Sequence, residues 1–133
     1  MDIIEIYKKE MLDKKNWAII GVTKDKNKFG YKIWKLLKSR GYNVFGINPK
    51  YDEIDGEKIY DSINSLPVVP EVVNIVVNPN IALLQLDQVM KNKIEYVWFQ
   101  PGTIDEIVLD KAELLNLKIV YYECVYADLL NQK

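Results

Sequence analysis

Five short apolar segments recur along the chain at intervals that leave room for a crossover between each pair. They begin at residues 17, 43, 73, 96 and 118, so successive starts lie 26, 30, 23 and 22 residues apart. Most lack polar alternation and are rich in β-branched or aromatic residues, which is typical of strands buried on both faces of a parallel sheet. The pattern predicts an α/β fold with five parallel strands, at residues 17–21, 43–47, 73–77, 96–99 and 118–122.

Amphipathic segments fill most of the gaps between these strands. Apolar residues at helical spacing predict helices at residues 3–14, 30–40, 80–92 and 103–116. The last of these begins with Thr103 and, three residues later, Glu106, the pattern of a capping box.

The second gap differs from the others. It holds a turn at Asp55-Gly56 and two prolines, Pro67 and Pro70, so only a short helix near residues 61–66 fits there. The simplest architecture is an α/β sandwich forming one domain over residues 1–133, with its core at about 16–124. Right-handed crossovers leave two common strand orders, 3-2-1-4-5 and 2-1-3-4-5, and the sequence does not choose between them.

The scarcity of histidine and cysteine excludes several kinds of catalytic and metal site. The 133 residues contain no histidine and one cysteine, Cys124. Histidine general bases, Ser-His-Asp and Cys-His arrangements and His-ligated metals are therefore excluded, and one cysteine cannot build a Cys-rich zinc site. A lone cysteine forms no internal disulfide, so a reducing cytoplasm is the expected compartment.

Charge and hydropathy weigh against two classes of partner. Basic and acidic residues number 18 and 19, and the pI is near 5.5, which argues against general nucleic-acid binding. No stretch approaches the ~20 continuous apolar residues of a membrane span, and the N-terminal segment does not read as a signal peptide. We expect a small-molecule ligand and a monomer or weak homo-oligomer, and a protein partner is left open.

The expected ligand site lies where the strands end. In an open α/β sheet, ligands bind at the carboxyl ends of the strands, where the strand order reverses. The segments that follow the five strands contain, in order, Gly21-Val22-Thr23, Asn48-Pro49-Lys50, Asn78-Pro79-Asn80, Gln100-Pro101-Gly102-Thr103 and Glu123-Cys124. They offer no paired carboxylates, no nucleophile with a base and no metal set, so we interpret this edge as a binding crevice rather than a catalytic one.

The stretch after the first strand favours an anion. Gly21 would let the backbone turn tightly and a ligand approach. The N–H groups at the start of the helix after Gly30 attract negative charge, worth roughly 0.3–1 kcal/mol for one charge. Thr23 could add its hydroxyl, and together these groups predict a phosphate site. Both glycines could instead serve only the turn and the packing of helix on strand.

Positive charge gathers in the same stretch. Ammonium groups attract phosphate without demanding strict geometry. The lysines concerned are Lys24, Lys26, Lys28 and Lys32. Lys50, after the second strand, could reach another phosphate. Since 17 of the 18 basic residues are lysines, an ordinary solvated surface is the alternative explanation for each of them.

A dinucleotide is the alternative ligand. The Rossmann fingerprint G-x-G-x-x-G should follow the first strand, but that stretch reads G-V-T-K-D-K-N-K-F-G and lacks the middle glycine. NAD binding also expects an acidic residue after the second strand, where the chain has Asn48-Pro49. Lys50 suits a phosphate, as on NADP or coenzyme A. An NAD(P)-binding redox or sensory protein is therefore the second hypothesis.

Two further hypotheses remain. One is an enzyme or acyl carrier that uses the thiol of Cys124, although the neighbouring Glu123 works against a reactive thiolate. The other is an interaction module whose crevice holds no ligand.

Four stretches, in this order and spacing, resemble one known family. They are "AIIGVTKDKNKFGYKIWKLLKSRGYNVFGINPK", "DEIDGEKIYDSINSLP", "VNIVVNP" and "YVWFQPGTIDEIVLDKAELLNLKIVYYEC". The chain thereby resembles the small CoA-binding proteins of the Rossmann-like CoA-binding domain family, relatives of the CoA-binding domain of the succinyl-CoA synthetase alpha chain. The resemblance implies a Rossmann-like three-layer sandwich and the non-catalytic binding of coenzyme A or an acyl-CoA.

The resemblance also implies which residues bind the ligand. They are Gly21, Val22, Thr23, Lys28, Phe29, Gly30, Lys32, Asn48, Pro49, Lys50, Val77, Asn78, Pro79, Gln100, Gly102 and Cys124. The chain departs from the family at Pro101 and at Glu123. A carboxylate at position 123, with no obvious partner in the sequence, is expected to repel an anionic end of the ligand.

Overall fold

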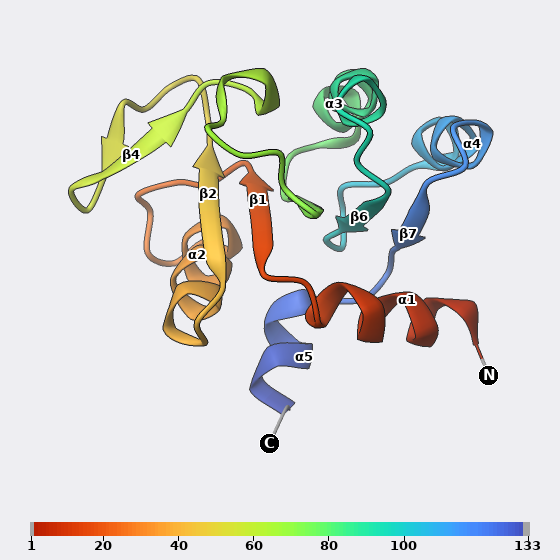
Figure 1. Cartoon of the computed structure of the whole chain (residues 1–133), viewed down its shortest axis with the longest axis horizontal. Coiled ribbons are helices and arrows are strands. Elements are labelled where there is room, and N and C mark those ends of the chain that lie inside the picture. Colours follow the sequence, from red (N-terminus) through yellow and green to blue (C-terminus); the bar gives the residue numbers. More distant parts are fainter. Residues whose placement is uncertain (1, 132–133) are drawn as a thin grey trace.

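A single sheet lies between two layers of helices in the computed structural model, which describes residues 2–131 (Figure 1). The strands are β1 (Asn16–Ile20), β2 (Asn43–Ile47), β3 (Glu53–Ile54), β4 (Glu57–Tyr60), β5 (Val72–Ile75), β6 (Tyr96–Phe99) and β7 (Lys118–Val120). The helices are α1 (Ile3–Leu12), α2 (Phe29–Ser39), the 3-10 turn η1 (Ile63–Ser65), α3 (Pro79–Lys91), α4 (Glu106–Leu114) and α5 (Val125–Asn131).

The sheet has seven strands and is mixed, so the prediction of five parallel strands was incomplete. Its order is β3-β4-β2-β1-β5-β6-β7, and only the β3–β4 pair is antiparallel. The two extra strands form a hairpin in the second gap, around the turn predicted at Asp55-Gly56. Both turn residues have positive φ, 54° and 79°, as a tight hairpin turn of this kind requires. The five predicted strands are present in the order 2-1-3-4-5.

The strands are buried on both faces because apolar residues occupy both alternating sets of positions. In β1, Trp17 and Ile19 belong to one core cluster, whereas Ala18 and Ile20 belong to the other. Helices α1, α2 and α5 contribute to the first cluster, and α3 and α4 to the second. Figure 1 shows these two groups of helices on opposite sides of the strands. This continuous burial explains the near absence of polar alternation in the sequence.

Local capping sets where the helices begin. Asn78 accepts a hydrogen bond from the backbone N–H of Ile81 (3.1 Å), and Pro79 occupies the first turn of α3. The capping box predicted at Thr103 was wrong. Asp105 caps α4, while the buried Thr103 donates its hydroxyl to the carbonyl of Gln100 (2.6 Å) and closes the turn before the helix.

The crossover between β4 and β5 carries only one short helical turn. Pro67 and Pro70 follow η1 and prevent a longer helix, as expected from the sequence. The segment contributes Ile63 to the second core cluster, with Leu66 packed against it. The sheet face next to α3 is therefore covered by one turn where doubly wound folds usually place a full helix.

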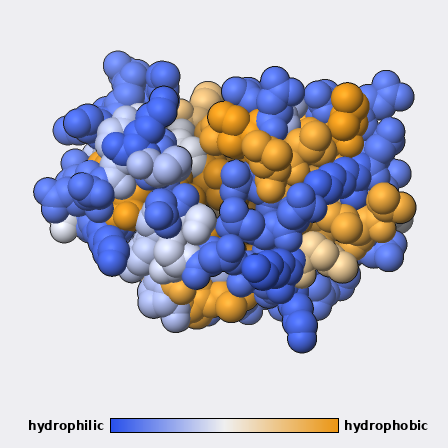
Figure 2. Space-filling model, turned by 90° about the horizontal axis from the view of Figure 1, so that it is seen from above, coloured by the Kyte–Doolittle hydropathy of each residue, from blue (hydrophilic) through white to orange (hydrophobic). Residues whose placement is uncertain are grey.

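The outer faces of α3 and α4 carry exposed apolar side chains. Figure 2 shows apolar atoms gathered over the half of the molecule that holds these two helices. The largest contributors are Leu84, Ile107 and Leu114, which are 68%, 66% and 81% exposed. Within residues 2–131, no helix has the length and apolar run needed to cross a bilayer.

An ionic cluster fastens α1 to the C-terminal end of the fold. The buried ammonium group of Lys8 lies 2.8 Å from Glu123, 3.1 Å from Asp128 and 3.1 Å from Glu5. Burial lowers the pKa of Lys8, but the hydrogen bonds that Lys8 donates to these carboxylates outweigh it and raise the pKa above its ordinary value of 10.5. Glu123 therefore has a partner that the sequence did not reveal.

We predict that Lys8→Ala lowers the free energy of unfolding by roughly 1–2 kcal/mol, because partly exposed carboxylates lose their cation. Thermal unfolding at neutral pH measures the change, and Lys9→Ala, at an exposed position of the same helix, is the control. Since the pKa of Lys8 is raised on folding, this contribution is fully present below pH 10.5 and is lost as the pH rises beyond it. Equal melting temperatures of the two variants would contradict the prediction.

Candidate functional site

Two adjoining cavities open at the carboxyl ends of β1, β2 and β5. The larger, here called the groove, has a volume of about 540 Å³ and is lined by Gly21, Thr23, Asn27, Lys28, Phe29, Gly30, Asn48, Lys50, Tyr51, Val76 and Val77. The smaller, here called the slot, has a volume of about 250 Å³ and is lined by Ile20, Gly21, Ile47, Asn48, Pro49, Lys50, Asp61, Val77, Ile81, Gln85 and Gln88. They adjoin each other at Gly21, Asn48, Lys50 and Val77, which line both, and together they are called the hollow.

This hollow lies at the point where the strand order reverses. Strand β1 is paired with β2 on one side and with β5 on the other. The chain leaves β1 into α2 on one face and leaves β5 into α3 on the opposite face. The two connections diverge and leave a crevice between them, which is the usual ligand site of such folds.

Two glycines let the loop after β1 pack against its neighbours. Gly21 has φ +106°, and a Cβ there would lie 2.9 Å from the carbonyl oxygen of Val76. A Cβ at Gly30 would lie only 2.3 Å from the carbonyl oxygen of Gly21. The first turn of α2 therefore rests directly on the backbone at the end of β1, and neither position has room for a side chain.

The N-terminus of α2 differs electrostatically from the N-termini of the other long helices. Asp2, Asn78 and Asp105 cap α1, α3 and α4 with their side chains. The cap position of α2 is Lys28, which makes no capping hydrogen bond, and the first turn contains no acidic residue. The start of α2 thus lines the groove with no capping side chain and with the positive charge of Lys28 beside it.

Four of the five predicted lysines divide into two sets, and the fifth, Lys26, is exposed and lines neither cavity. Lys28 and Lys50 are exposed and line the groove. Lys24 and Lys32 stack instead over aromatic rings, at 5.6 Å from the centroid of Tyr51 and 5.4 Å from that of Phe29. Lys32 does not line either cavity.

Asn48 and Thr23 tie the loops together. The side-chain amide of Asn48 donates to the carbonyl of Val22 (2.9 Å), and its oxygen accepts from the backbone N–H of Lys50 (2.9 Å). The hydroxyl of Thr23 lies 3.2 Å from that of Tyr51. These polar groups hold the loops after β1 and β2 in register, and Tyr51 was not among the predicted residues.

The predicted residues after β5 have separate positions. Val77 lines both the groove and the slot. Asn78 and Pro79 line neither cavity, and their contacts are those of a helix start.

The predicted residues after β6 and β7 lie apart from the hollow. Gln100 is buried, its oxygen accepts from the N–H of Val125 (2.9 Å), and its amide donates to the Sγ of Cys124 (3.3 Å). Gly102 adopts φ +86° in the turn that follows β6. Gln100, Gly102 and Cys124 line neither the groove nor the slot, and the Gln100 side chain already has partners within the fold.

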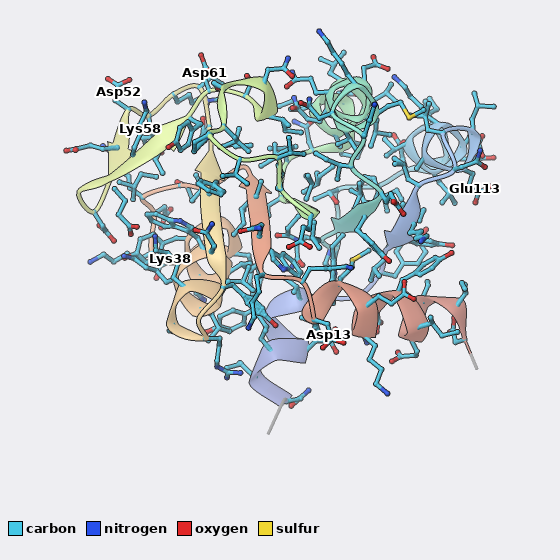
Figure 3. All side chains as sticks on the ribbon, viewed as in Figure 1. Asp13, Lys38, Asp52, Lys58, Asp61 and Glu113 are labelled. Carbon is cyan, nitrogen blue, oxygen red and sulfur yellow. The ribbon has the colours of Figure 1, made fainter. Side chains whose placement is uncertain are left out.

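Six lining residues of the slot were not among the predicted site residues, and two of them, Ile20 and Ile47, lie at the ends of predicted strands. Ile81, Gln85 and Gln88 follow the i, i+4, i+7 spacing of one helix face, which was the available signal. Asp61 joins them from the loop after β4, at the upper edge of the molecule in Figure 3. The Oε1 atom of Gln88 is buried and has no hydrogen-bond partner within the described chain.

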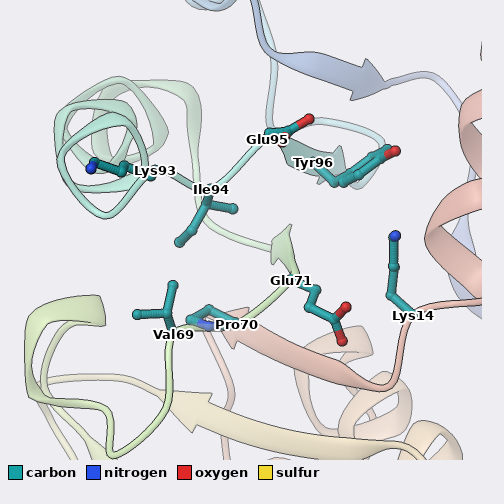
Figure 4. A pocket seen from close by; sticks show the side chains of 8 residues that line it. All are labelled: Lys14, Val69, Pro70, Glu71, Lys93, Ile94, Glu95 and Tyr96. Atoms are coloured by element: carbon teal, nitrogen blue, oxygen red, sulfur yellow. The ribbon is translucent and has the colours of Figure 1, made fainter.

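A third hollow, of about 270 Å³, lies at the opposite edge of the sheet (Figure 4). Its acidic groups already have partners. Glu71 accepts from the backbone N–H of Asn16 (3.1 Å), and Glu95 pairs with Lys118 (3.2 Å). Among residues 2–131, no three potential metal-ligating side chains are grouped together.

Comparison with known proteins shows which family the chain belongs to. The sequence profile of the family described as "CoA binding domain" matches residues 15–129. The chain belongs to the CoA-binding domain family. Its fold is thus the α/β, Rossmann-like fold with a mostly parallel sheet.

Three relatives illustrate the family. An ADP-forming acetate–CoA ligase of Methanocaldococcus jannaschii is 44% identical over 70 residues, which cover 52% of this chain and 10% of the ligase. The structure of a conserved hypothetical protein from Pyrococcus furiosus has 32% identity and a TM-score of 0.81, covering 86% of this chain and 98% of that one. A hypothetical protein from Pyrococcus horikoshii has 30% identity and a TM-score of 0.87, covering 96% and 92%. The chain spans 10–17% of the length of the curated relatives.

We predict that Gly30→Ala destabilises the protein although alanine is the better helix former. Alanine gains roughly 0.5–1 kcal/mol over glycine within a helix. The contact with the backbone oxygen of Gly21 forces a shift that costs about 1–3 kcal/mol, and this term should win because a backbone atom cannot rotate away. Urea denaturation measures the free energy of unfolding of both proteins. A variant more stable than the parent would contradict the prediction.

Proposed function

We propose that this chain binds coenzyme A or an acyl-CoA in the groove and the slot, and performs no bond-making of its own. The observation that carries the proposal is the uncapped, lysine-flanked N-terminus of α2 beside two glycines that admit no side chain. Membership of the CoA-binding domain family supports the same ligand class.

The phosphates fit the groove. Lys28 and Lys50 supply two ammonium groups on its walls, and the first N–H groups of α2 supply donors that need no side-chain movement. Charge-assisted hydrogen bonds of this kind are the strong ones in proteins. The place where an NAD-binding fold would carry an acidic residue holds Asn48-Pro49, and Lys50 follows it, so the charge after β2 favours a phosphate.

The base fits the slot. Its walls include the side chains of Ile20, Ile47, Val77 and Ile81, which suit the faces of an aromatic ring. The slot adjoins the groove at the residues they share, so we assign the base of the ligand to the slot and its phosphates to the groove.

The proposal is limited to binding. The ADP-forming ligase is about ten times as long as the matched part of this chain, and the groove and the slot contain no histidine, no cysteine and no pair of acidic residues. A reducing cytoplasm remains the expected compartment.

Thermal unfolding with added ligand tests the proposal. Coenzyme A at 100 times its dissociation constant should stabilise the folded chain by about 2.7 kcal/mol, which raises the melting temperature by roughly 10 °C. NADP at the same concentration should produce a smaller shift. Absence of any shift at millimolar coenzyme A would refute the proposal.

The two groove lysines provide a matched test. We predict that Lys28→Ala combined with Lys50→Ala weakens binding of coenzyme A roughly tenfold or more, and makes the remaining affinity less sensitive to salt. Lys9→Ala combined with Lys91→Ala removes the same charge at exposed positions outside the groove and is the control. Calorimetric titration measures the affinity of both double variants for coenzyme A. Equal losses of affinity would show that only the net charge of the protein matters.

A further inference from the structure

Four exposed apolar side chains lie along the two helices that cover one face of the sheet. They are Leu84 and Met90 of α3, and Ile107 and Leu114 of α4. We call these four residues the apolar face, and Figure 2 shows apolar atoms over this half of the molecule. None of them lines the groove or the slot. Exposed apolar residues gathered in one region are typical of an interaction surface, and this one lies outside the proposed ligand site.

Helices α3 and α4 run in the same direction and are held in register. Each connects two neighbouring parallel strands, α3 from β5 to β6 and α4 from β6 to β7. The ammonium group of Lys111 on α4 lies 2.9 Å from the carboxylate of Asp87 and 3.5 Å from the carbonyl oxygen of Leu83, both on α3. Because Lys111 is level with this turn of α3, Ile107 lies beside the first half of α3 and Leu114 beside the second half.

The two ends of this helix pair carry opposite charges. Lys91 and Lys93 are exposed at the C-terminal end of α3, and Asp105 and Glu106 are exposed at the N-terminal end of α4. Within residues 2–131, neither Lys91 nor Glu106 belongs to an ion pair. Since the helices run in the same direction, the basic group and the acidic group lie at opposite ends of the apolar face.

The charge of α4 disfavours a membrane as the occupant of this face. Asp105, Glu106, Asp110 and Glu113 outnumber Lys111, the one basic residue between positions 105 and 114. Such a helix repels the anionic headgroups of a lipid surface. The acidic end of α4 instead needs a basic partner, and the basic end of α3 needs an acidic one. A second copy of this chain carries both.

We propose that the apolar face binds the same face of a second copy of this chain across a two-fold axis. An axis perpendicular to the helices reverses their direction, so the N-terminal end of α4 in one copy meets the C-terminal end of α3 in the other. Glu106 then lies opposite the partner's Lys91. The contact occurs twice in each dimer, because a two-fold interface uses the same surface on both subunits.

The same axis matches the apolar side chains with each other. Ile107 lies at the acidic end of the face, so it meets the partner's Met90 at the basic end. Leu114 lies beside the second half of α3, so it meets the partner's Leu84 in the first half. The apolar face is therefore complementary to itself in both shape of contact and charge, which is what association of identical copies requires.

Sedimentation equilibrium of the full chain, from micromolar to millimolar concentration, tests the proposal. The apparent mass of the parent should rise with concentration from 15.5 kDa toward twice that value. Leu84→Asp should weaken dimerisation roughly tenfold or more, because it buries an unpaired charge in the interface. Leu130→Asp is the matched control and should leave dimerisation unchanged, since Leu130 is also exposed but belongs to α5 on the other side of the sheet.

Charge reversal tests the two-fold arrangement. Lys91→Glu and Glu106→Lys should each weaken dimerisation roughly tenfold, because each replaces two attractive contacts with two repulsive ones. An equimolar mixture of these two variants should associate about as tightly as the parent, since both contacts of the mixed dimer are attractive again. Melting curves confirm that each variant is folded.

Three outcomes would overturn the proposal. A parent that stays monomeric at millimolar concentration would show that a second copy is not the occupant of the apolar face. A parental dimer that Leu84→Asp leaves intact would show that the copies associate through another surface. A mixture of Lys91→Glu and Glu106→Lys that associates no better than either variant alone would exclude the two-fold pairing of α3 with α4.

Discussion

Direct backbone contact between the end of β1 and the first turn of α2 is the constraint on which the site depends. The carbonyl of Gly21 lies where a Cβ of Gly30 would be, so the helix starts as close to the sheet as a backbone allows. The start of α2 therefore lies among the residues that line the groove. Any side chain at either position would push the helix away and open the loop that carries Lys28.

Much of the fold was predictable because it follows from local patterns. The five main strands were evident from continuous apolar runs, since burial on both faces removes polar alternation. The hairpin was missed because Glu53–Ile54 and Glu57–Tyr60 are too short and too polar to show a pattern. The strand order could not be read from the sequence, because both candidate orders satisfy the same crossover lengths and differ only in long-range packing.

The candidate site was predictable only in part. The stretch from Gly21 to Gly30 stood out because glycines and lysines gather at the end of one strand, although helix packing and a solvated surface were alternative explanations. Asn48 and Asn78 were predicted as ligand-binding residues. In the structure the side chain of Asn48 holds two loops together, and that of Asn78 caps the start of α3. Gln100 was predicted to bind the ligand, and its side chain makes hydrogen bonds with Val125 and Cys124 within the fold. The slot was not predicted, because its shape depends on how elements distant in the sequence pack together.

The single turn between β4 and β5 has a consequence for how this fold can change. The slot is bordered on that side by Asp61, while its other walls come from β1, β2, the loops that follow β1, β2 and β5, and α3. Lengthening the segment from Asp61 to Pro70 by a turn or two would leave the pairing of every strand unchanged. The space beside the slot can therefore vary with insertions at one connection, independently of the residues that line the groove.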